Sequence, residues 1–324
     1  MTKPSRITAA SGNMHPLSSL TLGPLLFNWE PRAWSDFYAR IADEAPVDRV
    51  CIGEVICAKR LPLYADQLAS AIERLRRAGK RVVLSSLALV TLPRERRQTE
   101  ELAAATGCEL EINDLTALRY QISGPFAVGP FVNVYNEGTL DFLARCGAGH
   151  VCLPPELPLT SVTSLAAAAR TLGMEAEVWA FGRLPLALSG RCYHARLHGL
   201  AKDNCRFVCG DDPDGRPVDT IDGRHFLAVN GVQTVSFAYA NLLSEIPTLR
   251  DAGIGSFRIS PQTCDMMAVA QLFRKVLDGS VDPNDATAEL CRLLPEAQFA
   301  NGFLAGPYGA AYTGGLPHPA PDHR

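Results

Sequence analysis

The sequence has little of what marks a membrane or secreted protein. No apolar run approaches the roughly 18 residues that a membrane-spanning helix needs, and the first twenty residues lack the apolar core of a secretory signal. We therefore expect a cytoplasmic protein, in a compartment that keeps thiols reduced. There, the ten cysteines of the chain are better explained by free thiols and metal binding than by structural disulfides.

Two further absences narrow the classes of function. No G-x-G-x-x-G motif follows the first apolar strand and no P-loop occurs, which disfavours a dinucleotide or nucleotide fold. The formal net charge is −3, so a broad basic surface for nucleic acid is not expected. No serine, cysteine or metal constellation typical of a peptidase stands out either.

Apolar strands alternate with amphipathic helices along most of the 324 residues. This alternation implies parallel pairing, and seven or eight such units favour an α/β fold with a closed, TIM-barrel-like (β/α) barrel over an open sheet. We expect a flexible leader at 1–19, one barrel domain at 20–305, a solvated acidic loop at 211–223 and a disordered, proline-rich tail at 306–324. The expected strands are 20–29, 47–52, 82–87, 109–112, 126–128, 150–153, 175–181, 233–237 and 256–259, and the expected helices are 33–44, 63–78, 95–106, 137–146, 161–172, 241–251 and 264–277.

Polar residues that directly follow apolar strands are candidates for a pocket, because loops after the strands form the working face of such a barrel. A polar residue in that position also simply meets water, so both interpretations stay open. The candidates are Glu54, Asn113, Asn136, Glu156 and Arg183.

The segment from Ser189 to Gly210 carries the chemistry of the chain. Cys192, Cys205 and Cys209 are separated by twelve and then three residues, among polar neighbours and glycines that would be poor core partners. Thiolates select zinc or iron-sulfur centres, and a closed site of either kind usually has four protein ligands. The spacing therefore predicts a metal site that lacks one ligand.

Cys57 is the natural fourth ligand, because it lies in the loop after the second expected strand, at the same end of the barrel. Cys51 lies inside that strand and is expected in the core. Core packing also accounts for the remaining cysteines, which are Cys108, Cys146, Cys152, Cys264 and Cys291.

Two histidines offer a rival zinc site near Cys192. His194 and His198 are four residues apart, so a helix would place them on one face. No glutamate follows His194 to complete an H-E-x-x-H motif, and Gly199 would end the helix early. The thiol site is therefore the stronger prediction.

The stretch EVWAFGRLPLALSGRC at 177–192 resembles a block of the collagenase-like U-type peptidase family. That block has a glutamate, an aromatic residue two positions later, a glycine, a cysteine and a closing S-G-x-C. The matching residues here are Glu177, Trp179, Gly182, Ser189, Gly190 and Cys192, and Pro185 stands where most members carry the inner cysteine.

In this departure the chain resembles one branch of the family, which serves ubiquinone biosynthesis without oxygen. The same branch is similar in the stretches GEVICAKR, LSSLALV, KDNCRFVC, LAVNGVQT and RISPQ. The resemblance covers about residues 20–277. It implies a [4Fe-4S] cluster on Cys57, Cys192, Cys205 and Cys209, and so iron-sulfur rather than zinc.

The resemblance also implies partners. A paralogue of the same family and a lipid-carrier-like accessory protein would join this chain in hydroxylating the ring of a ubiquinone precursor, and prephenate is a proposed hydroxyl donor in related members. Hydroxylation of RNA by a related mechanism and a peptidase-family protein with a structural zinc are the alternatives. A cluster held by four cysteines favours electron transfer or structural support, with Arg191 and Lys202 as candidate neighbours of its sulfurs.

Overall fold

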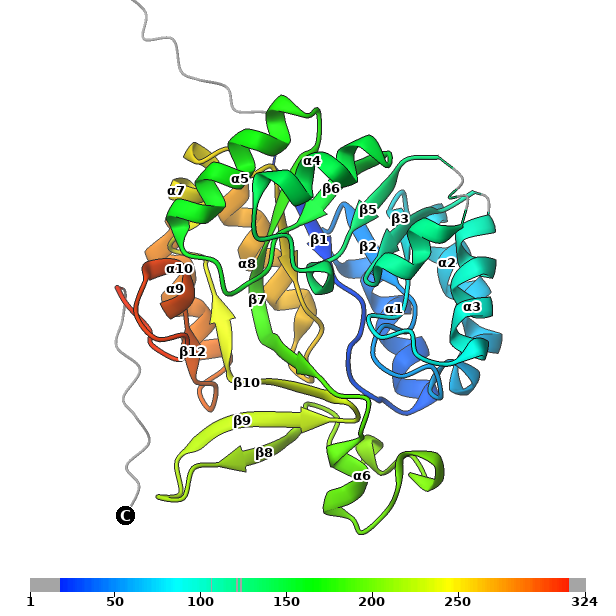
Figure 1. Ribbon diagram of the computed structural model, residues 1–324. Helices are drawn as coiled ribbons and strands as arrows, with labels where there is room; N and C mark the ends of the chain where they lie inside the picture. Colours follow the sequence, from blue (N-terminus) through cyan, green and yellow to red (C-terminus); the bar gives the residue numbers. More distant parts are fainter. Residues whose placement is uncertain (1–17, 106, 121, 123, 315–324) are drawn as a thin grey trace, which may run out of the picture.

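The computed structural model describes residues 18–314 except 106, 121 and 123. Eight parallel strands form a closed barrel, in which β11 pairs with both β1 and β7 and so joins the first strand to the seventh (Figure 1). The predicted TIM-barrel-like fold is confirmed. The barrel strands are β1 (Ser19–Leu22), β2 (Arg49–Ile52), β3 (Arg81–Ser85), β4 (Glu109–Ile112), β5 (Phe126–Val128), β6 (Ala148–Cys152), β7 (Glu175–Leu188) and β11 (Ser256–Ile259).

Helices connect most of the strands and surround the barrel, whereas the described residues between β4 and β5 include only the short 3₁₀ helix η2 (Leu115–Arg119). In the described part of the chain, no helix is long and apolar enough to cross a membrane. The connecting and C-terminal helices are α1 (Pro31–Glu44), α2 (Ala65–Arg77), α3 (Pro93–Ala104), α4 (Glu137–Arg145), α5 (Leu159–Thr171), α7 (Ile246–Asp251), α8 (Met266–Leu277), α9 (Pro283–Leu293) and α10 (Gly302–Ala305).

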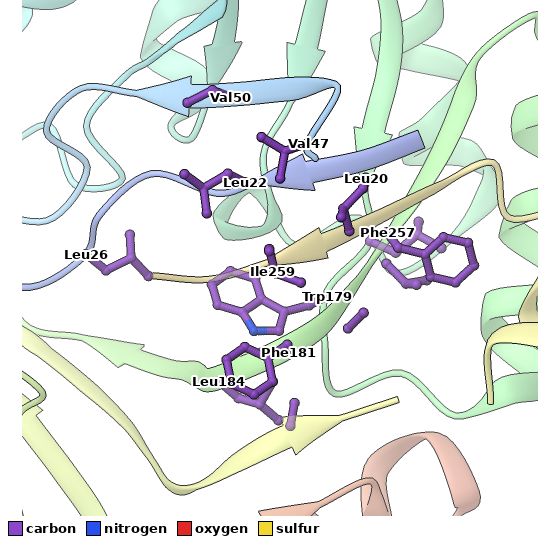
Figure 2. Packing of buried hydrophobic residues seen from close by; sticks show 14 of the residues in the cluster. Leu20, Leu22, Leu26, Val47, Val50, Trp179, Phe181, Leu184, Phe257 and Ile259 are labelled. Carbon is purple, nitrogen blue, oxygen red and sulfur yellow. The ribbon is translucent and has the colours of Figure 1, made fainter. Parts of the chain in front are cut away.

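Strand alternation divides the core into two regions. Leu20 and Leu22 of β1, with Phe257 and Ile259 of β11, are fully buried on the side that faces the helices (Figure 2). The intervening Thr21 faces into the barrel, where its hydroxyl lies 3.1 Å from that of Ser256. The layer between strands and helices is therefore apolar, whereas the barrel interior is polar.

A network of buried charges fills that interior. The Arg258 guanidinium donates to the Glu177 carboxylate at 2.7 Å and also to Glu111, and all three side chains have zero exposure. His150 lies 3.4 Å from Glu177 and 3.4 Å from Glu175. Opposite charges in close contact offset the cost of removing each one from water.

β7 runs beyond the barrel and carries a small antiparallel sheet with it. Its outer part pairs with β10 (Gln233–Asn241), which pairs with β9 (His225–Asn230), which pairs with β8 (Arg216–Asp219). The cysteine-rich segment between β7 and β8 includes α6 (Tyr193–Leu197), and Figure 1 shows it beneath the barrel beside the blue chain that leaves β1. This sheet holds the segment against the end of the barrel where the strands finish.

Several sequence-based boundaries were wrong for local reasons. The strand expected at 20–29 ends at Leu22, where Gly23 and Pro24 follow and proline has no N–H to donate. The strand expected at 233–237 is β10, which extends to Asn241 outside the barrel, so the helix expected at 241–251 begins at Ile246. The acidic loop expected at 211–223 contains β8.

The chain ends also differ from expectation where they are described. Residues 1–17 of the expected leader lie outside the described part of the chain. Ser19, the last residue of that expected leader, belongs to β1. The tail was expected to be disordered from Gly306, but Asn301 accepts a bond from the Thr313 N–H at 2.8 Å and donates to the Thr313 carbonyl at 2.8 Å. Residues 315–324 lie outside the described part.

Candidate metal centre

The four predicted cysteines line one pocket. Cys57 comes from the loop after β2, and Cys192, Cys205 and Cys209 come from the segment after β7. Both segments leave strands at the same end of a parallel barrel, which is why residues so far apart in sequence meet there. The structure thus brings together the whole predicted set.

Glu54 holds the loop that carries Cys57. Its Oε1 accepts from the backbone N–H groups of Ile56 and Cys57, both at 2.8 Å, and the Tyr64 hydroxyl donates to its Oε2 at 2.6 Å. Both carboxylate oxygens are therefore engaged, and the side chain is only 6% exposed. Glu54 therefore shapes the Cys57 loop, and it also lines the separate cavity described below, as its place after a strand led us to expect.

A strained turn joins the last two cysteines. Arg206 and Phe207 both have left-handed backbone conformations, with φ of 49° and 56°. For residues other than glycine this conformation costs about 1–2 kcal/mol each. Such strain is typical of sites where a ligand-binding geometry is imposed, and here it directs Cys205 and Cys209 into one pocket.

Asn230 at the end of β9 ties the cysteine segment to the barrel. Its side-chain N–H groups donate to the carbonyls of Cys209 and Asp212, both at 2.8 Å. Its Oδ1 accepts from the Arg60 guanidinium at 2.6 Å and from the Asn28 N–H at 3.3 Å. One fully buried amide therefore connects three separate segments around the pocket.

Arg60 places a positive charge at the wall of the cysteine pocket. Its guanidinium is 1% exposed and donates to the Leu26 carbonyl at 3.0 Å and to Asn230, both uncharged acceptors, while its Nε has no hydrogen-bond partner. Burial opposes this charge, but the neighbouring Cys209, Glu54 and Cys57 outweigh it and the pKa of Arg60 is raised.

Lysines complete the basic side of the pocket. Lys59 and Lys202 both line it, and Lys59 Nζ donates to the Lys202 carbonyl at 2.8 Å. Arg191 is exposed and is not among the lining residues, so of the two neighbours expected at the sulfurs only Lys202 lies there. Burial raises the pKa of the Cys57 and Cys192 thiols, which keeps them neutral until a metal displaces the protons.

This donor set fits an iron-sulfur cluster. Four thiols in one pocket match the ligand number of such a centre, and a buried guanidinium with an unpartnered nitrogen complements the negative charge of metal-bound thiolates.

The other polar residues considered after strands have structural roles. Asn113 is buried and bonds to Ser86 and Glu111, and Asn136 caps α4 by accepting from the Thr139 N–H at 2.8 Å. The remaining two also contact protein groups: Glu156 accepts from the Tyr135 hydroxyl, and Arg183 donates to the Ser236 carbonyl and covers the rings of Phe237 and Tyr239.

The cysteines outside the pocket mostly follow expectation. Cys51 and Cys152 are fully buried, and Cys108, Cys264 and Cys291 are partly buried against the core. Cys146 is exposed just after α4, so its assignment to the core was wrong.

A separate cavity of about 210 Å³ adjoins the Glu54 loop. Its walls come from β2, β3, α2 and α3, and Glu54, Ser85, Gln98 and Glu101 add polar groups. The apolar lining is Ile52, Leu61, Leu68, Leu84, Leu87 and Leu102.

An eight-stranded (β/α) barrel with a four-thiol pocket at one end defines the class of this protein. Residues 34–312 match the model of peptidase family U32, and the chain belongs to that family.

Solved structures with a similar arrangement share little sequence. The tryptophan synthase complex from Pyrococcus furiosus is 15% identical, with 86% of this chain and 96% of that chain covered and a TM-score of 0.39. A putative dihydrodipicolinate synthase family protein from Coccidioides immitis is 10% identical, with 87% and 95% covered and a TM-score of 0.29. Neither likeness bears on function, and the barrel rests on the strand pairing itself.

Proposed function

We propose that this chain is a UbiV-type protein, a [4Fe-4S] subunit that acts with a UbiU-like paralogue in oxygen-independent hydroxylation of the ubiquinone precursor ring. The observation that carries the proposal is the meeting of Cys57 with Cys192, Cys205 and Cys209 in one pocket. Membership of peptidase family U32 and the sequence stretches shared with the ubiquinone branch support it.

In this proposal the four thiolates hold the cluster, and Arg60 and Lys202 supply positive charge beside it. A cluster with four cysteine ligands leaves no iron position for substrate, so it supplies electron transfer or structural support. The lipid-carrier-like accessory protein would present the precursor to the pair of paralogues in the cytoplasm.

The aliphatic cavity beside the Glu54 loop is a candidate site for the apolar part of the precursor. Its lining is mainly aliphatic with a few polar groups, which is the character of small-molecule pockets. Filling it with Leu84→Phe is expected to lower ubiquinone formation and leave the iron content unchanged. Normal ubiquinone formation by this variant would remove the cavity from the proposal.

Deletion of the gene tests the function directly. We expect ubiquinone to be lost in cells grown without oxygen and kept in cells grown with oxygen. Wild-type protein should restore it, Cys205→Ala should not, and the wild-type chain should co-purify with its UbiU-like paralogue. Unchanged anaerobic ubiquinone in the deletion strain would contradict the proposal, and a colourless protein carrying zinc in the thiol pocket would favour a structural role.

A further inference from the structure

Two imidazoles and a carboxylate gather beside the cysteine pocket without belonging to the thiol set. His194 lies in α6, His198 directly follows that helix, and Asp212 follows the last cysteine by three residues. Each of these three residues has one possible ligand atom, a ring nitrogen or a carboxylate oxygen, and the three atoms all lie within 4.8 Å of one another. Asp212 was not anticipated from sequence, because the strained turn at 206–207 brings it back toward α6.

Both ring nitrogens of His194 face oxygen atoms. The side chain has zero exposure, with Nδ1 3.2 Å from the Val229 carbonyl and Nε2 3.1 Å from Asp212 Oδ2, and the Val208 carbonyl also lies near the ring. A neutral imidazole carries one N–H, so its other nitrogen presents a lone pair to an oxygen. That contact is unfavourable in a buried place unless a second proton or a metal ion lies between the two atoms.

His198 presents a further lone pair next to this group. Its ring stacks on that of His194 with 5.5 Å between centroids, and the Arg216 guanidinium lies 3.4 Å from its Nε2. A guanidinium only donates, so the Nε2 of His198 accepts. Arg216 is exposed and can leave, and the nitrogen is then available to a metal ion.

We propose that His194, His198 and Asp212 form a second metal site, for a divalent transition metal ion such as Zn²⁺ or Fe²⁺. Imidazole and carboxylate donors suit such ions, whereas the thiols next to them suit an iron-sulfur cluster. The 3.1 Å between His194 Nε2 and Asp212 Oδ2 matches two ligands on one tetrahedral ion with bonds of about 2.0 Å.

The Val229 carbonyl supports this geometry from behind. By accepting from Nδ1–H it fixes the ring so that Nε2 points to the ion, as carbonyl partners commonly do for metal-bound histidines. Three protein ligands leave a coordination position for water, and His198, at the end of α6, is the ligand that has to rotate inward.

Zinc binding to the full-length, anaerobically purified chain tests the site. We expect equilibrium dialysis against Zn²⁺ to load one ion per chain in addition to the cluster, and zinc-edge X-ray absorption to report nitrogen and oxygen neighbours without sulfur. His198→Ala and Asp212→Asn should each weaken zinc binding by about tenfold or more and keep the iron content of the wild type. His225→Ala is the matched control, because His225 pairs with exposed Asp219 at 2.7 Å, and it should bind zinc normally.

Absence of bound zinc, zinc with sulfur neighbours only, or zinc binding that survives both substitutions would overturn the proposal. In that case a second proton on His194 would balance the acceptors around its ring. Iron and sulfide measured on the same samples report the cluster separately, so failure of the second site and failure of the proposed function are distinguishable.

Discussion

Arg60 is the residue whose burial most needs an explanation. Its guanidinium donates to uncharged acceptors, and the Glu54 carboxylate near it already has both oxygens hydrogen-bonded to other groups. A further anion beside the guanidinium would offset the cost of burying its charge. In the proposed cluster-loaded state the cysteine thiolates would supply that anion, and Arg60 would in turn stabilise the more negative, reduced form of the cluster.

Replacing Arg60 tests this pairing of charges. Arg60→Met is expected to shift the reduction potential of the cluster to a more negative value, measured by anaerobic redox titration followed by electron paramagnetic resonance. Arg60→Lys should shift it less, and Arg191→Met, which alters an exposed charge outside the pocket, should leave it unchanged. A potential unmoved in Arg60→Met would show that the guanidinium does not act on the cluster.

Single thiols can be compared in the same way. Cys57→Ala removes one of four ligands and is expected to lose most of the bound iron, whereas Cys108→Ala alters a thiol outside the pocket and should keep it. Both expectations are checked by measuring the iron content per chain with elemental mass spectrometry. Full iron in Cys57→Ala would assign the fourth ligand to another residue.

At the scale of elements, the site depends on how the segment after β7 is held to the barrel. The link is made by the turn between β9 and β10, where Gly231 has φ of 69° and a side chain would meet the Arg60 guanidinium. Asn230 immediately before it bonds to the Arg60 side chain and to the backbones of Asn28, Cys209 and Asp212.

Asn230→Ala is therefore expected to destabilise the protein by about 1–3 kcal/mol, because it leaves buried donors and acceptors without partners. It should also lower the iron content, since the segment that carries three ligands is released. Asn136→Ala, which removes the cap of α4 far along the chain, is the control: it should cost about 1 kcal/mol and leave the iron unchanged. Equal iron in the two variants would contradict this role of Asn230.

The barrel strands could be predicted from sequence, because each carries buried apolar residues over a short stretch and most are separated from the next by helical periodicity. The small sheet of β8, β9 and β10 could not, since its pairing depends on contacts between β7 and a strand more than forty residues later. For the same reason Cys57 could be assigned from its place after a strand, whereas Arg60 and Asn230 were missed. Their partnership exists only once that sheet is folded.

At the scale of the whole molecule, the buried charges inside the barrel link its stability to pH. Burial by itself would lower the pKa of His150, but the Glu177 and Glu175 carboxylates outweigh burial and the pKa is raised. His150 therefore contributes stability in full below its unfolded pKa of about 6.5, and the contribution is lost as pH rises through the folded value.

We expect the thermal midpoint of the wild type to fall between pH 6 and pH 8 by more than that of His150→Gln, which cannot titrate. Each unit by which the folded pKa is raised corresponds to about 1.4 kcal/mol at low pH. The comparison uses the change with pH and not the absolute midpoint, so a general destabilisation by the substitution does not obscure it. If the thermal midpoints of the two proteins change with pH in parallel, His150 has the same pKa in the folded and unfolded chains and the prediction is contradicted.

The fold places four thiols in the lining of one pocket, and the proposal that they hold a single iron-sulfur cluster is the central claim. The most direct test is the iron and acid-labile sulfide content of the full-length chain purified without oxygen. The account predicts a brown protein with four iron and four sulfide per chain, the composition of a [4Fe-4S] cluster. A colourless protein with zinc in the thiol pocket, or one without bound metal after reconstitution with iron and sulfide, would contradict it.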